Sequence, residues 1–280
     1  MDEAERARQQ RETAANWAAR AGTWTEWAPK IEHLARGLNE PLIAAADVQP
    51  GQQVLDIASG AGEPAIPIAG IVGPQGRVTA TDLTQGMLDG LKQRAAALGL
   101  GNMDFRQADM EALPFPAATF DRATCRLGLM YTARPEVAAA EARRVLKPGG
   151  RAAWLVWGPV EDNSQFEILD RVLHDDFGIE AHEAGFTPSR FGAPGAISAV
   201  LRGGGFARFE EREVRFAPRV DPATGFWRPQ IALRLGDRLA AMSIAERDRL
   251  DRAMAAAFEP LREGERIRLK ALVRIGIGLA

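Results

Sequence analysis

Cysteine is almost absent from this chain of 280 residues, since Cys125 is the only one. A single thiol excludes an internal disulfide framework and a metal site built from several cysteines. No apolar run approaches the length of a membrane span. The N-terminal stretch MDEAERARQQRETAANW is charged and has no apolar segment, so it is unlike a secretory signal. We therefore expect a cytoplasmic protein with no metal site and no membrane span.

Clustered positive charge is also lacking. The formal net charge is -2 at pH 7, and the sequence holds no strong run of Lys or Arg. Proteins that bind nucleic acid need such clusters to contact phosphates. We expect the partner to be a small molecule and not a nucleic acid, and the protein to be a monomer or homodimer.

The sequence does contain enough apolar residues, 46% of the chain, to form the core of one large domain. Residues 1–48 have a helical pattern in which Trp17, Trp24 and Trp27 share one face, and Gly22 is expected to interrupt the helix. From residue 52 onward, short β-rich runs alternate with helical stretches, which predicts a parallel sheet with helices on both faces. The expected strands are 53–57, 77–81, 103–107, 120–125 and 152–157, and the expected helices are 63–71, 85–98 and 135–146.

The alternation changes after Trp157. Residues 158–190 are expected to be irregular, 194–202 to form a helix, and 208–216 to form a strand. The stretch SIAE at 243–246 fits a capping box that opens a helix. The alternating pattern over 266–277 predicts a final strand with one buried face. We expect an N-terminal helical lid over 1–48 and one α/β domain over 49–280, with a helical insert at about 220–262.

The stretch VLDIASGAGEPA, residues 54–65, joins the first expected strand to the next helix. Gly60 and Gly62 have no Cβ, so the backbone there can approach a ligand closely. The spacing Gly60-x-Gly62-x-x-Ala65 also matches a dinucleotide-binding fingerprint, although this short pattern alone is not specific. In open α/β sheets, ligands bind beyond the carboxyl ends of the strands, which is where this loop would lie.

Acidic residues distinguish between the ligands that such a loop could hold. Asp56 and Glu63 flank the loop, and Pro64 removes an N–H group that a pyrophosphate would use. Asp82 follows the second strand, where a carboxylate can accept from both ribose hydroxyls. Asp109 follows the third strand, where it can accept from an adenine amine. This charge pattern favours S-adenosylmethionine (SAM), which carries an ammonium and a sulfonium and has no phosphate.

Four blocks of the sequence resemble the class I SAM-dependent methyltransferases, particularly the ubiquinone/menaquinone-biosynthesis methyltransferase-like group with a methyltransferase type 11 domain. They lie within about residues 45–157 and read VLDIASGAGEP, VTATDLTQGML, FRQADMEALPFPAATFD and RVLKPGGR. The resemblance implies a Rossmann-like, seven-stranded, doubly wound sheet with an antiparallel last strand. It also implies SAM as the cofactor and S-adenosylhomocysteine (SAH) as its product. Ala58 departs from the family pattern, which has its first glycine there, but alanine is small enough for binding to survive.

The resemblance also implies which residues contact SAM. The first block would hold the methionine part, Asp82 the ribose, and Asp109 with Met110 the adenine, while Arg126 would border the cofactor after the fourth strand. The full set of expected cofactor contacts is Asp56, Ala58, Gly60, Ala61, Gly62, Asp82, Leu83, Met87, Asp109, Met110 and Arg126.

Methyl transfer depends mainly on aligning the acceptor with the methyl group, and a base helps when the acceptor is a hydroxyl or an activated ring carbon. His174 and His182, after the fifth strand, are the candidate bases, with ordinary surface histidines as the alternative. Trp24, Arg126 and Tyr131 are the candidate acceptor contacts. Trp24 could instead pack in the core, and Arg126 could bind a substrate carboxylate or form a salt bridge.

We predict methyl transfer to an O, N or C atom of a small, aromatic or lipophilic molecule. Two alternatives remain open at this point. An NAD(P)-dependent oxidoreductase would share the glycine loop and the acid after the second strand. A non-catalytic protein with the same fold would bind a partner through the insert.

Overall fold

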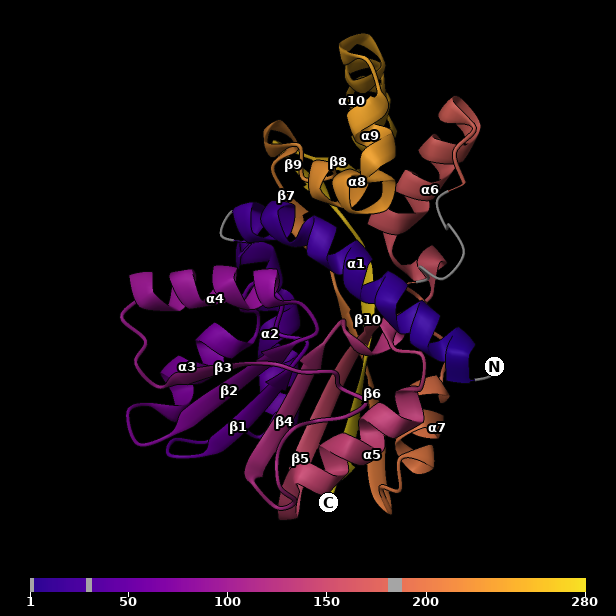
Figure 1. Ribbon diagram of the computed structural model, residues 1–280. Coiled ribbons are helices and arrows are strands. Elements are labelled where there is room, and N and C mark those ends of the chain that lie inside the picture. Colours follow the sequence, from indigo (N-terminus) through magenta and orange to yellow (C-terminus); the bar gives the residue numbers. More distant parts are fainter. Residues whose placement is uncertain (1–2, 29–31, 181–187) are drawn as a thin grey trace.

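A mixed seven-stranded sheet forms the centre of the protein (Figure 1). The structure, a computed structural model, describes residues 3–28, 32–180 and 188–280. The strand order is β3-β2-β1-β4-β5-β10-β6, and β10 runs antiparallel to both of its neighbours. The strands are β1 (Gln53–Ile57), β2 (Arg77–Asp82), β3 (Met103–Gln107), β4 (Phe120–Arg126), β5 (Leu146–Trp157), β6 (Arg208–Phe216) and β10 (Ala271–Leu279). The predicted Rossmann-like class with an antiparallel last strand is confirmed.

Residues 54–57 of β1 and 152–156 of β5 are all buried, as expected for strands that are covered on both faces. Leu55 and Ile57 of β1 enter one core, whereas Val54 enters the other. The first core lies under α5 (Pro135–Val145) and α7 (Ala196–Gly203). The second lies under α2 (Glu32–Ala46), α3 (Ala65–Val72) and α4 (Gln85–Ala97). Helices therefore cover both faces of the sheet and leave its carboxyl edge for the site.

Helix α1 (Glu3–Trp27) lies across the carboxyl ends of the strands (Figure 1). It packs against α4 on one side and against α8 (Arg228–Leu235) on the other. The helix continues through Gly22, so the predicted interruption is wrong. An exposed glycine costs a helix only about 1 kcal/mol relative to alanine, which the neighbouring turns offset.

The segment between β6 and β10, residues 217–270, contains the predicted insert of about 220–262 and is called the insert below. It contains α8 (Arg228–Leu235), α9 (Asp237–Ala241) and α10 (Ile244–Phe258), and α10 begins with the predicted capping box at Ser243. It also contains a three-stranded sheet of β7 (Arg219–Val220), β8 (Arg262–Glu263) and β9 (Arg266–Arg268). The sequence predicted a helical insert, but the insert also contains this small sheet.

The single strand expected over 266–277 is divided into β9 and β10. Ile267 and Leu269 are buried in the core of the insert, whereas Val273 and Ile275 are buried against the main sheet. The same alternation thus serves two different cores. A pattern with a period of two cannot show where the chain passes from one sheet to the other.

Residues 158–190 are not irregular throughout, because α6 (Ser164–Phe177) lies within them. Its buried side chains Ile168, Leu169, Val172 and Leu173 follow helical spacing and join the core of the insert. This helix therefore packs against α10 of the insert. Among the residues described, no helix is long and apolar enough to cross a membrane.

Candidate functional site

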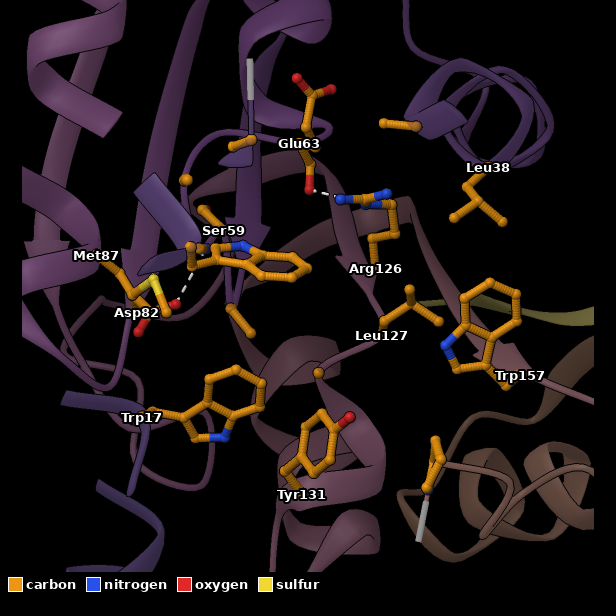
Figure 2. A pocket seen from close by; sticks show the side chains of 18 of the residues that line it. Trp17, Leu38, Ser59, Glu63, Asp82, Met87, Arg126, Leu127, Tyr131 and Trp157 are labelled. Carbon is orange, nitrogen blue, oxygen red and sulfur yellow. Dashed lines mark hydrogen bonds between the residues drawn. The ribbon is translucent and has the colours of Figure 1, made fainter. Parts of the chain in front are cut away.

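A cavity opens at the carboxyl edge of the sheet, between the loop after β1, helix α1 and the insert (Figure 2). One part of it is lined by the strand-end loops, and most residues there belong to the predicted cofactor set. These residues are Ala58, Gly60, Ala61, Gly62, Asp82, Leu83, Met87, Asp109, Met110 and Arg126. The structure thus brings together all the predicted cofactor contacts except Asp56.

The loop after β1 depends on residues that adopt positive φ. Gly60 and Gly62 have φ of 51° and 115°, and Ala58 has φ of 55°. A non-glycine residue in this region costs roughly 1–2 kcal/mol. A Cβ on Gly128 would lie 2.5 Å from the Cβ of Ala58, so the methyl group of Ala58 occupies space that Gly128 leaves free. Ala58 can therefore stand where the family pattern has a glycine, because Gly128 after β4 leaves room for its methyl group.

Gly62→Ala should destabilise the protein by about 1–2 kcal/mol, because a Cβ at this φ is strained and crowded. That Cβ would lie 2.6 Å from Leu91 Cδ1 and 2.7 Å from Ile66 Cδ1. Gly70→Ala is the matched control in the adjoining helix, where a Cβ meets nothing within 4 Å. It should raise stability by up to about 1 kcal/mol. Equal urea midpoints for the two variants would contradict this account of the loop.

Asp82 and Asp109 are the acids that face the cavity without an ion-pair partner among the described residues. Asp82 accepts hydrogen bonds from the backbone N–H of Gly60, at 3.0 Å, and from the backbone N–H and hydroxyl of Thr84. Asp109 accepts from the N–H of Glu111 at 2.8 Å. Burial raises the pKa of both carboxyls above the usual value, although these hydrogen bonds act in the opposite direction and lower it. Each keeps capacity to accept from a ligand.

Asp56 does not line the cavity and is fully buried beneath the loop. Its Oδ1 accepts a hydrogen bond from the hydroxyl of Thr124 at 2.6 Å, and its Oδ2 has no partner in the described part of the chain. Burial raises the pKa of this carboxyl from 3.8 to about 7. Its predicted direct contact with the cofactor therefore has no support from this geometry.

Glu63 lines the cavity, but its carboxylate is occupied elsewhere. It pairs with the Arg94 guanidinium at 3.1 Å and accepts a hydrogen bond from the Asn39 amide. Figure 2 shows the carboxylate turned away from Arg126, whose Nε donates to the Glu63 carbonyl oxygen at 3.0 Å. The carboxylates of Asp56 and Glu63 therefore do not face the ligand site, contrary to the prediction from the sequence. Asp82 and Asp109 supply the negative charge there.

Helix α1 contributes aromatic side chains that cover the cavity. Trp17 and Trp24 both line it, and the ring of Trp17 meets that of Tyr131 edge-on, with centroids 5.0 Å apart. The Trp24 indole nitrogen lies 3.2 Å from where a Cβ on Gly60 would be, so this ring closes over the glycine loop. Trp27 is not among the lining residues. Burial raises the pKa of the Tyr131 phenol, which keeps it protonated.

The other part of the cavity, called the apolar chamber below, is lined mainly by apolar side chains. Most of them come from elements that the sequence did not connect with the site. The aromatic members of the chamber are Trp157, Phe166, Phe216 and Phe226, from β5, α6, β6 and the insert. The helical spacing of the apolar residues in α6 was the signal that could have identified Phe166. No sequence pattern indicated that Phe226 would reach the same cavity.

His174, a predicted base, lies outside the cavity lining on the last turn of α6. Its imidazole is 63% exposed, and its Nδ1 lies 2.9 Å from the Asp175 carboxylate. The hydrogen bond to Asp175 raises its pKa, with Glu180 adding to the effect. His174 is therefore an ordinary surface histidine, the alternative considered from the sequence, and we assign it no role in the reaction. His182, the other predicted base, lies outside the described residues.

Among the described residues, no group of three or more His, Cys, Asp or Glu could hold a metal ion.

Comparisons with known proteins agree with this geometry. The family model described as "Methyltransferase domain" matches residues 54–150. The ubiquinone/menaquinone biosynthesis C-methyltransferase UbiE of Cupriavidus metallidurans is 40% identical over 134 residues, 45% of this chain and 55% of that enzyme. An uncharacterized protein of Mycobacterium tuberculosis is 38% identical over 134 residues, 48% of this chain and 47% of that protein. The chain thus matches about half the length of these curated relatives.

A solved structure extends the likeness beyond the matched residues. The YcgJ protein of Bacillus subtilis superposes with a TM-score of 0.55 and 22% identity, over 88% of this chain and 98% of that one. At this identity the likeness concerns the fold. Residues 54–150 are therefore similar to the methyltransferase domain, and the chain as a whole shares the fold of this solved protein.

Proposed function

We propose that the protein is a SAM-dependent methyltransferase whose acceptor is a small aromatic or lipophilic molecule. The observation that carries this proposal is the convergence of Asp82, Asp109 and the glycine loop on one cavity, which continues into an apolar chamber. Two unpaired carboxylates suit a ligand that offers hydroxyl and amine donors and carries positive charge. They disfavour a diphosphate, which would add negative charge beside them.

The residues at the three successive strand ends suit the three parts of SAM, which are the methionine part, the ribose and the adenine. The loop at 58–62 would hold the methionine part, Asp82 the ribose hydroxyls, and Asp109 the adenine amine, with Leu83, Met87 and Met110 packing around them. When bound, SAM supplies an electrophilic methyl group on its sulfonium. The chain's own contribution is to position the acceptor and exclude water. Trp17 and Trp24 cover the cavity, and the aromatic wall would orient a flat or apolar acceptor.

Calorimetry with SAH, NAD and NADP tests the cofactor. We expect SAH to bind and the two dinucleotides to bind at least about tenfold more weakly, a difference of about 1.4 kcal/mol. Tighter binding of NAD or NADP would favour an oxidoreductase. Methyl transfer from labelled SAM to a panel of phenols, hydroxybenzoates and quinols tests the reaction. SAH binding without transfer to any acceptor would favour a non-catalytic role of the fold.

A further inference from the structure

Arg126, the last residue of β4, is a cation in the cavity wall with no anionic partner among the described residues. Its one hydrogen bond runs from Nε to the Glu63 carbonyl oxygen, and its two terminal nitrogens make none to the described residues. A guanidinium has five N–H donors and stays protonated in proteins. Most of its capacity to bind an anion is therefore free.

The nearby acids do not neutralise Arg126. Glu63 directs its carboxylate to Arg94 and Asn39, and Asp56 bonds to Thr124. Burial lowers the pKa of Arg126, and the negative charges of Glu63 and Asp56 only partly oppose this effect. An enclosed charge is costly unless it is paired and hydrogen-bonded. The salt bridge considered from the sequence is absent among the described residues, which leaves a ligand as the source of the counter-charge.

Arg126 stands where the two parts of the cavity meet. The glycine loop is on one side, and Leu38, Leu127 and Trp157 line the cavity on the other (Figure 2). An apolar surrounding strengthens a charge-assisted hydrogen bond. The planar guanidinium also matches a carboxylate in bidentate geometry.

We propose that Arg126 binds a carboxylate of a ligand in this cavity, either the methionyl carboxylate of SAM or a carboxylate on the acceptor. This inference rests on the proposed function for the identity of the ligands. Both sources place the same chemical group at the same guanidinium. Probes that carry or lack that group can therefore distinguish them.

The test is calorimetry on the full chain with Arg126→Gln and Arg126→Lys. The probes are SAH, 5'-methylthioadenosine, which lacks the amino-acid part, and the carboxylates benzoate, phenylacetate and octanoate, each with and without saturating SAH. Arg122→Gln is the matched control on the same strand, since that side chain bonds to Asp47 away from the cavity. Circular dichroism and thermal melting check that each variant is folded.

If the carboxylate is that of the cofactor, Arg126→Gln should weaken SAH at least about tenfold and leave methylthioadenosine unchanged within about twofold. If it belongs to the acceptor, SAH should be unaffected, and a carboxylate probe should bind wild type but bind Arg126→Gln at least about tenfold more weakly. Arg126→Lys should restore part of the lost affinity in either case. Unchanged affinity of folded Arg126→Gln for every probe would overturn the inference. Failure of wild type to bind SAH would overturn the proposed function, and the carboxylate titrations would still test Arg126.

Discussion

Asp82→Ala should weaken SAH binding at least about tenfold, or about 1.4 kcal/mol, and about a hundredfold if both ribose hydroxyls lose their acceptor. The carboxylate lies at the end of β2 and lines the cavity. Hydrogen bonds to a charged acceptor contribute about 1.5–3 kcal/mol each. Removing the acceptor would leave two hydroxyl donors of an enclosed ligand without a partner. Isothermal titration calorimetry with SAH measures the loss directly.

Asp104→Ala is the matched control for this prediction. Asp104 lies on the neighbouring strand β3, pairs with Arg77 at 2.9 Å, and is not among the cavity residues. Its SAH affinity should equal that of wild type. Asp82→Ala also removes the acceptor for the N–H groups of Gly60 and Thr84, so the loop itself is weakened. SAH affinity within about twofold of wild type, in a folded Asp82→Ala protein, would refute the ribose assignment.

The pH dependence of binding provides a second readout of Asp82. Burial holds the pKa of this carboxyl above its usual 3.8, so the folded protein without ligand protonates it at a higher pH than a model acid. A ligand that donates hydroxyls to the carboxylate favours the ionised form. SAH affinity should therefore fall on acidification through this raised pKa, and the fall should be smaller in Asp82→Ala.

The main sheet could be predicted from the sequence because its signals are local. Each strand from β1 to β4 has a short β-rich run that ends at a turn or loop, and helical stretches follow these runs. Asp82 and Asp109 were predicted as site residues for the same reason, since the ends of parallel strands share one edge. These inferences needed no knowledge of which residues meet across the fold.

The directions of the loop acids could not be predicted, because their partners are distant in sequence. Glu63 pairs with Arg94, 31 residues later, and Asp56 bonds to Thr124, 68 residues later. Sequence spacing indicates which strand end holds an acid but not which side of the loop it faces. The apolar chamber was missed for a related reason. Phe166, Phe216 and Phe226 come from three separate elements, and only tertiary packing brings them to one cavity.

Asp56→Asn should make the protein more stable relative to wild type at pH 8 than at pH 5, by about 2–3 kcal/mol. The pKa of Asp56 rises from 3.8 in the unfolded chain to about 7 in the folded protein. The unfolded chain therefore loses this proton first, and the folded state becomes progressively less favoured as the pH rises from about 4 to 7. Above pH 7 both states are ionised and the penalty is constant. Asparagine has the shape of the protonated acid, can still accept from Thr124, and never ionises.

Asp121→Asn, on the same strand as Thr124, should show the opposite dependence. Asp121 accepts from Lys147 at 2.7 Å and from the N–H of Gln53, and its pKa is lowered despite partial burial. Its stabilising contribution is present above the unfolded pKa and disappears as the pH falls through the folded pKa. Asp121→Asn should therefore lose more stability at pH 8 than at pH 3. Urea unfolding of both variants and wild type at pH 5 and 8, with Asp121→Asn and wild type also at pH 3, measures these differences. A pH-independent gap between Asp56→Asn and wild type would mean that Asp56 ionises normally beneath the loop, and that the orphaned Oδ2 is satisfied by water.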